Sequence, residues 1–188
     1  MRKYKTIVID PPWPMQEFTH KGVHAGQSMK YPTMTIDEIR ALPVSALASD
    51  GCSLFLWTTQ TFLPDALDLL KAWDFKYHLT ITWDKGGGLV QFGWHRRTEF
   101  VIYAYKERVT FEPRGQAVDS IIREFPELFE EPSTVHSRKP ISFIRAVEAK
   151  TEAPRLEMFA RHKRAGWDVW GNEVVSDIDI EAVAAESK

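Results

Sequence analysis

The chain has 188 residues and a formal net charge of −2, which excludes a general polycation, so any affinity for nucleic acid must come from local basic patches. The length suits one domain with its own core, and 44% hydrophobic with 27% charged residues is ordinary for a globular protein. Cys52 is the only cysteine, which excludes an intramolecular disulfide and a cysteine-rich zinc site and fits a cytoplasmic location. No apolar run approaches the length of a membrane span, so no membrane partner is expected.

Apolar periodicity and turn residues predict the elements along the chain. A short buried strand at 5–9 ends abruptly at Asp10-Pro11-Pro12, because proline lacks the N–H that strand pairing needs. Thr35 and Glu38 fit a capping box that begins a short helix. The other expected elements, in chain order, are a polar loop at 14–33, a strand at 53–57, a helix at 62–73, a strand at 78–83, a loop opened by Gly86-Gly87-Gly88, a strand at 98–105, a short helix at 119–124, a helix beginning at Pro140, and strands at 155–159 and 167–170.

Strands that alternate with helices in this way predict an α/β sheet with helices on both faces. We expect a single domain over residues 1–176. The acidic, alanine-rich residues 177–188 are expected to form a tail, either as a loose helix or disordered.

The sharpest motif is Asp10-Pro11-Pro12-Trp13 at the end of the first strand. Ligands of open α/β sheets bind at the carboxyl ends of strands. The Asp10 carboxylate and the Pro11 carbonyl can accept both N–H bonds of an adenine amine and so aim its lone pair at a methyl donor. Two prolines stiffen this turn, which lowers reorganisation during a reaction, and Trp13 offers a face for a stacked base. The alternative is a strand-ending turn with a surface tryptophan.

The tetrapeptide resembles the catalytic signature of the adenine-N(6) methyltransferases, a family that includes the eukaryotic messenger-RNA adenosine methyltransferase and many bacterial and phage enzymes. Other segments resemble that family in one consistent order over nearly the whole chain: Tyr31-Pro32-Thr33-Met34, Leu54–Thr58, Gly93-Trp94 followed by Glu99, His136–Pro140, Leu156–Arg161 and Gly166–Glu173. The resemblance implies a circularly permuted, Rossmann-like methyltransferase fold in which the catalytic motif precedes the cofactor motifs. This order would explain why no glycine-rich nucleotide loop follows the first strand.

The resemblance also implies S-adenosylmethionine as the cofactor and assigns roles to individual residues. Asp10 and Pro11, with Pro12 beside them, would hold the target amine, while Trp13 and Tyr31 would frame the flipped adenine. The residues implied to bind the cofactor are Asp10, Lys139, Glu157, Arg161, Asn172 and Glu173.

Physical arguments that do not depend on the resemblance also support two of these cofactor roles. A lysine beside a helix start suits a carboxylate, which fits Lys139 and the methionine carboxylate. A carboxylate at a strand end suits ribose hydroxyls, which fits Glu157. Taken alone, Glu157 and Arg161 are equally consistent with a surface ion pair.

Basic residues gather in segments that we expect to surround the site. His95-Arg96-Arg97 falls in a predicted loop, and Lys21 and Arg138 lie in other irregular stretches, so these five are candidate phosphate contacts. A solvated surface is the alternative for each cluster. His20 and His24 have no companion ligands in the sequence, so no metal is expected.

The function that these features indicate is S-adenosylmethionine-dependent methylation of the 6-amino group of adenine in DNA. The same reaction on RNA, a catalytically silent subunit and an unrelated nucleotide-binding α/β protein are the alternatives. A paired adenine would first have to be extruded from the stack. The chain is too short for a separate recognition domain, so target choice is expected from the loops at 14–33 and 84–98, from a homodimer or from a partner protein.

Overall fold

The computed structural model describes residues 2–14, 32–91, 93–107, 121–123 and 139–187. The elements run, in chain order, β1 (Tyr4–Ile9), α1 (Ile36–Arg40), α2 (Val44–Leu47), β2 (Ala48–Thr59), α3 (Leu63–Ala72), β3 (Lys76–Gln91), β4 (Trp94–Tyr105), β5 (Ile121–Arg123), α4 (Ile141–Lys150), β6 (Arg155–Met158), β7 (Trp167–Trp170) and α5 (Ile180–Glu186). No helix in these ranges has the length and apolar character needed to cross a membrane.

The described strands form one seven-stranded sheet in the order β5-β3-β4-β2-β1-β6-β7. β1 pairs in parallel with β2 on one side and with β6 on the other, whereas β4 runs antiparallel to both β2 and β3. The carboxyl ends of β1, β2 and β6 therefore meet at one edge of the sheet. Asp10 follows β1 at that edge, which is where ligands of such sheets bind.

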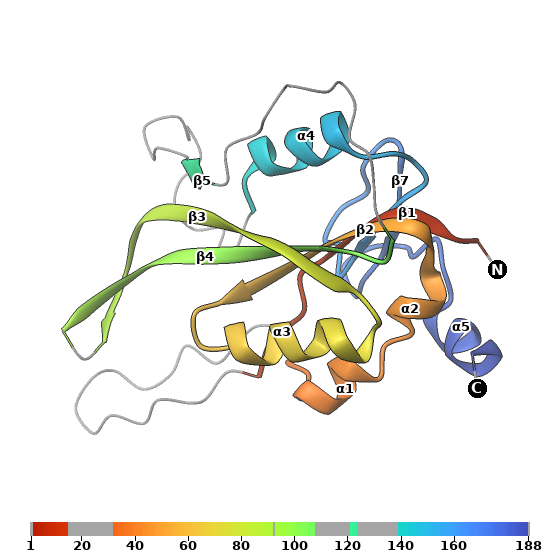
Figure 1. Ribbon diagram of the computed structural model, residues 1–188, viewed down its shortest axis with the longest axis horizontal. Helices are drawn as coiled ribbons and strands as arrows, with labels where there is room; N and C mark the ends of the chain where they lie inside the picture. The colour runs from red at the N-terminus through yellow and green to blue at the C-terminus, as the bar shows by residue number, and fades with distance from the viewer. Residues whose placement is uncertain (1, 15–31, 92, 108–120, 124–138, 188) are drawn as a thin grey trace.

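Helices cover both faces of the sheet, as the sequence predicts (Figure 1). On one face, α1, α2, α3 and α5 lie over a core that includes Ile7 and Ile9. On the other face, α4 lies over a second core that includes Val8 and Trp57. The alternation along β1 divides its side chains between these two cores, because successive residues of a strand point to opposite faces.

The local signals at two helix starts are confirmed. The Thr35 hydroxyl accepts the Glu38 N–H at 3.2 Å and the Glu38 carboxylate accepts the Thr35 N–H at 2.7 Å, which completes the capping box. α4 begins directly after Pro140 and buries Phe143 and Ile144.

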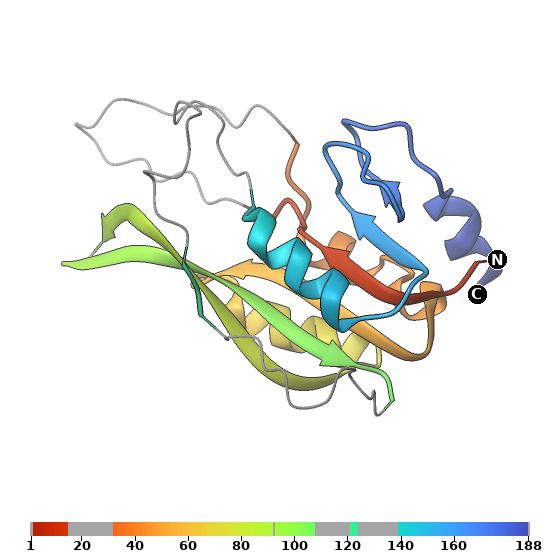
Figure 2. The same cartoon turned by 90° about the horizontal axis from the view of Figure 1, so that it is seen from above.

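The prediction of a loop at 84–98 is wrong. β3 and β4 continue through it as a two-stranded ribbon that projects beyond the rest of the sheet (Figures 1 and 2). The pairing register shifts between Asp84 and Leu89, and Gly86 there has a φ of 71°. The glycines thus lie at an irregularity within a strand and not in a loop. Glycine suits that position because it adopts positive φ without strain. Pairing with β4 outweighs their low strand propensity.

The prediction of a short helix at 119–124 is also wrong, because Ile121–Arg123 form β5, which pairs in parallel with β3.

The acidic segment at 177–188 contains α5, whose buried Val183 belongs to the same core as Ile7. The domain boundary at residue 176 stays a prediction. Most of the predicted loop at 14–33 lies outside the described residues.

Candidate active site

Four side chains of alternating charge meet at the carboxyl edge of the sheet. The Lys139 ammonium lies 3.1 Å from Asp10 Oδ1 and 3.2 Å from Glu99 Oε2. The Lys85 ammonium lies 3.0 Å from Glu99 Oε1. This row joins the end of β1, the residue pair before α4 and both strands of the ribbon, so ion pairs connect the Asp-Pro-Pro-Trp motif to the ribbon.

Burial and neighbouring charges shift the pKa values in this row. Burial raises the pKa of Asp10, and Lys139 offsets part of that effect. Burial acts to lower the pKa of Lys139, but Asp10 and Glu99 attract its charge more strongly and raise it overall. Burial acts to raise the pKa of Glu99, but Lys139 and Lys85 lower it overall. At neutral pH the row therefore holds a protonated Lys139 beside an ionised Glu99.

Two adjoining cavities flank the Asp10–Lys139 pair. The first has a volume of about 260 Å³ and is lined by the whole Asp-Pro-Pro-Trp motif together with Asn172. The second has a volume of about 410 Å³ and is lined by residues of α4 and by Glu157. The residues shared by both cavities are Asp10, Lys139, Phe159, Arg161 and Glu173. Two ligands could therefore meet across one carboxylate.

The Trp13 side chain forms a wall of the first cavity. It is only 7% exposed, its indole N–H donates to the Trp57 carbonyl at 3.1 Å, and its ring stacks on Phe62 with centroids 5.4 Å apart. The ring is thus fixed by the protein, and its predicted role against a base stays a prediction. The Trp13 backbone N–H also donates to the Pro11 carbonyl at 2.9 Å, which tightens the turn of the motif.

Glu157 holds an unsatisfied acceptor in the second cavity. Its Oε2 is buried and has no hydrogen-bond partner among the described residues, and the Arg164 Nε lies 3.7 Å away. Burial raises the pKa of Glu157, and Arg164 offsets part of that effect. Arg161 lies instead against Glu173, at 3.6 Å. Because buried acceptors are nearly always satisfied, Glu157 could accept a hydrogen bond from a ligand hydroxyl.

The turns after β6 and β7 pack closely and bring Asn172 to the first cavity. A Cβ at Gly171 would lie 2.3 Å from the Ala160 carbonyl oxygen, so the approach requires glycine. The Ala160 N–H donates to the Trp170 carbonyl at 3.0 Å. Phe159 has a φ of 63°, a strained conformation of the kind that clusters at functional sites.

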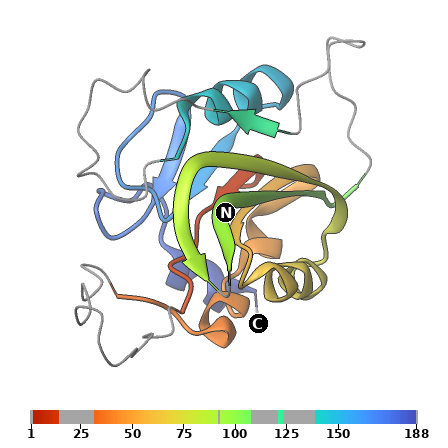
Figure 3. The same cartoon turned by 90° about the vertical axis from the view of Figure 1, so that its left-hand side faces the viewer.

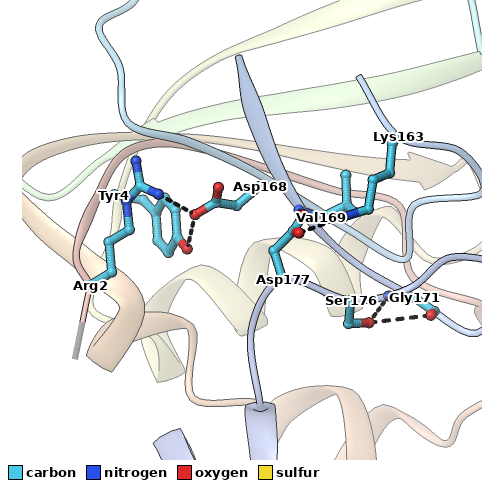
Figure 4. A network of polar contacts seen from close by, with 8 residues as sticks. All are labelled: Arg2, Tyr4, Lys163, Asp168, Val169, Gly171, Ser176 and Asp177. Carbon is cyan, nitrogen blue, oxygen red and sulfur yellow. Dashed lines mark hydrogen bonds and ion pairs between the residues drawn. The ribbon is translucent and has the colours of Figure 1, made fainter. Parts of the chain in front are cut away.

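A polar network fastens the chain beyond β7 (Figure 4). The Asp177 carboxylate accepts the Lys163 ammonium at 2.6 Å and the Val169 N–H at 3.0 Å. The Gly171 N–H donates to the Ser176 hydroxyl at 3.2 Å. These contacts close the segment that carries Asn172 and Glu173 into a short loop, and they engage Lys163 away from the cavities.

The structure brings most of the predicted site residues together. Those that line one or both cavities are Asp10, Pro11, Pro12, Trp13, Lys139, Glu157, Arg161, Asn172 and Glu173. His95, Arg96 and Arg97 lie on β4 within the ribbon rather than in a loop. Lys21, Tyr31 and Arg138 lie outside the described residues.

Sequence reasoning assigned no role to several residues of the site. Those that it missed include Phe62, Lys85, Glu99 and Phe159. Glu99 could have been recognised from the sequence, because it is an acidic residue directly before the apolar run Phe100–Ala104. The other three are ordinary in their local sequence, and only the fold places Phe62 and Phe159 at the first cavity and Lys85 against Glu99. In the described ranges no three His, Cys, Asp or Glu side chains are grouped to hold a metal.

Parallel strands with charged cavities at their carboxyl edge define the class of ligand-binding α/β proteins. Within that class, the chain belongs to the MT-A70 family, whose sequence profile matches residues 4–173.

Three relatives illustrate the relationship. The type II methyltransferase M.MunI of a Mycoplasma species is 32% identical over 92% of this chain and 78% of its own length. The human N(6)-adenine-specific methyltransferase METTL4 is 26% identical over 99% of this chain and 41% of its own length. The Arabidopsis thaliana N(6)-adenosine-methyltransferase MT-A70-like protein is 29% identical over 91% of this chain and 24% of its own length. The chain therefore spans less than half of the human and plant relatives, and it is a methyltransferase by family.

Proposed function

We propose that the protein transfers a methyl group from S-adenosylmethionine to the exocyclic 6-amino group of adenine in DNA. The observation that carries the proposal is the position of Asp10 and Lys139 between two cavities, one lined by the catalytic motif and the other by Glu157. A methyl donor on one side and an acceptor amine on the other would meet at the Asp10 carboxylate. Holding two reactants in this way supplies a large part of a rate enhancement.

The second cavity fits the cofactor, which would supply a methyl group on a positively charged sulfur. The buried Glu157 Oε2, which has no hydrogen-bond partner in the described ranges, suits a ribose hydroxyl. The Lys139 ammonium, protonated at neutral pH because Asp10 and Glu99 raise its pKa, suits the cofactor carboxylate. The Asp10 carboxylate, between the two cavities, suits the neighbouring positive sulfur.

The first cavity fits the adenine. Lys139 contacts Asp10 Oδ1, and the other carboxylate oxygen, Oδ2, could accept one amine N–H. The Pro11 carbonyl already accepts the Trp13 N–H, and its second lone pair can accept the other amine N–H. Both acceptors sit on a stiff turn, so little reorganisation precedes the reaction.

DNA is the substrate that we favour over RNA. The chain matches the type II methyltransferase M.MunI over most of the length of that protein, and the resemblance of Leu156–Arg161 and Gly166–Glu173 is to the bacterial members of the family. The cytoplasmic location and a homodimer or partner protein for target choice are further parts of the proposal.

The test is a methylation assay on single-stranded DNA, duplex DNA and RNA with methyl-labelled S-adenosylmethionine. The nucleosides would be identified by mass spectrometry, and Asp10→Ala and the near-isosteric Asp10→Asn would be assayed alongside. We expect methylated deoxyadenosine that both variants abolish. Label only in RNA would move the substrate to RNA. Cofactor binding without any label would indicate a silent subunit, and no cofactor binding would overturn the proposal.

A further inference from the structure

Among the described residues, the ribbon (residues 84–98 of β3 and β4) extends farthest from the two cores. It projects beyond the sheet in Figures 1 and 2, and Figure 3 looks along it from its outer end. β3 ends at Gln91 and β4 begins at Trp94. The connection contains Gly93 at a φ of 79°, which suits a two-residue hairpin.

The outer end of the ribbon is apolar and positively charged. Trp94 is 79% exposed and Val90 is 68% exposed, so neither contributes to a core. Between Gly86 and Thr98 the sequence contains two arginines and one histidine and no acidic residue, although the chain as a whole has a net charge of −2. An exposed aromatic ring among cations suits nucleic acid, whose phosphates and bases need both.

The inner end of the ribbon is fixed to the catalytic site. The Arg97 guanidinium forms two hydrogen bonds to the Asp84 carboxylate, at 2.9 and 3.0 Å. On the opposite face of β4, Arg96 donates to the Thr61 hydroxyl at 2.8 Å. Glu99, two residues beyond Arg97 on the same face, is the residue that contacts Lys139. The ribbon is thus held in a set orientation relative to the two cavities.

The dimensions of the ribbon match those of a DNA groove. Glu99 and Trp94 are five residue steps apart along an extended strand, a distance of about 17 Å. Successive base pairs rise by about 3.4 Å, so the tip reaches about five base pairs from the target adenine. The major groove, about 12 Å wide, admits a two-stranded ribbon.

We propose that the ribbon enters the major groove beside the target adenine and selects the flanking sequence, with Trp94 contacting bases and His95 and Arg96 contacting phosphates. Arg96 uses one of its five N–H groups on Thr61, and a guanidinium can contact phosphate with the others. The inference rests on the proposed methylation of DNA. The sequence left four sources of target choice: the segments 14–33 and 84–98, a homodimer or a partner protein. The inference favours the segment 84–98.

The test compares Trp94→Ala and Trp94→Phe with Tyr77→Ala, a matched control. Tyr77 is an exposed aromatic residue at the opposite end of β3, 51% exposed. Methylation of a duplex oligonucleotide library with randomised flanks would give the sequence preference, and a single preferred duplex would give KM and kcat. Thermal unfolding and S-adenosylmethionine binding would be measured for each variant.

We expect Trp94→Ala to raise KM for duplex DNA about tenfold, to flatten the preference within about five base pairs on one side of the adenine, and to leave cofactor binding unchanged. Trp94→Phe should restore most of the loss. An unchanged KM and preference in Trp94→Ala, an equal effect of Tyr77→Ala, or conversion of a dimer to a monomer would each overturn the inference. A wild-type protein that methylates no nucleic acid would instead overturn the proposed function.

Discussion

Glu99 connects the ribbon to the catalytic motif through two lysines. Its carboxylate contacts Lys85 with one oxygen and Lys139 with the other, and its side chain is 17% exposed. Without that charge, the two ammonium groups would lie near each other with Asp10 as the remaining carboxylate of the row. The charge on Glu99 therefore affects both the stability of the fold and the position of Lys139.

We expect Glu99→Gln to lower the free energy of unfolding by about 2 kcal/mol at neutral pH, because both lysines lose a charged acceptor. The folded pKa of Glu99 is lowered by its lysines against the opposing effect of burial. Its contribution is thus complete above the ordinary carboxyl pKa and is lost as the pH falls through the lower folded pKa. Urea denaturation of both proteins from about pH 7 to pH 3 checks this, since the difference between them should shrink with acid.

The matched control is Asp68→Asn, which removes an exposed ion pair with Lys71 on α3. Exposed pairs contribute little, so this variant should unfold nearly as the wild type does. A difference between Glu99→Gln and the wild type that stays constant down to acid pH would mean that the shape of the side chain, rather than its charge, is responsible.

Cys52 gives a second prediction at this scale. The residue lies on β2 with none of its surface exposed, and burial raises the pKa of its thiol to about 12. Because the thiolate is the reactive form, we expect no labelling by iodoacetamide in the native protein at about pH 8 and complete labelling in denaturant. Mass spectrometry checks this, and rapid labelling of the folded protein would show that β2 opens locally.

At the scale of elements, the N-terminal end of the described chain is joined to β7. The Asp168 carboxylate accepts the Arg2 guanidinium at 2.8 Å and the Tyr4 hydroxyl at 2.6 Å (Figure 4). β6 lies between β1 and β7 in the sheet, so these contacts cross a strand. They hold the β6–β7 pair, whose turns carry Asn172 and Glu173, against β1 and the Asp-Pro-Pro-Trp motif that follows it.

The helix α5 is too short to be stable alone, so its cap and its packing must hold it. The Asp179 carboxylate accepts the N–H groups of Glu181 and Ala182, each at 3.0 Å. We expect Asp179→Ala to lower the free energy of unfolding by about 1 kcal/mol, measured by urea denaturation. Glu186→Ala, at the exposed far end of α5, should have little effect. Equal effects of the two variants would show that the cap contributes nothing.

For the whole molecule, sequence reasoning succeeds where a signal is local or periodic. Three predictions depend on residues that are neighbours in the sequence, and all three are confirmed: the capping box at Thr35, the helix after Pro140 and the strand before Asp10. The motif also placed Asp10 at the correct edge of the sheet, because strand ends are visible in sequence.

Sequence reasoning failed where distant pairing decides the structure. The glycines at 86–88 are local signals for a loop, yet β4 pairs with this segment and turns it into a ribbon. Lys85 and Glu99 are fourteen residues apart, and Lys139 lies forty residues beyond Glu99. Their contact depends on the strand register and on the position of α4, neither of which a local window contains. The permuted order of the fold stays a prediction from resemblance.

The stability of the whole molecule should also report whether the second cavity holds the cofactor. A ligand at one hundred times its Kd stabilises a fold by about 2.7 kcal/mol, which for a chain of this size raises Tm by about 5–10 °C. We expect S-adenosylmethionine to produce such a shift in the wild type and in Glu181→Gln, which changes an exposed glutamate of α5. Glu157→Gln should reduce the shift, because the amide replaces the carboxylate acceptor in the second cavity. Differential scanning fluorimetry with and without the cofactor checks this. A full shift in Glu157→Gln would place the ribose elsewhere, and then the division of the site into a donor cavity and an adenine cavity would no longer hold.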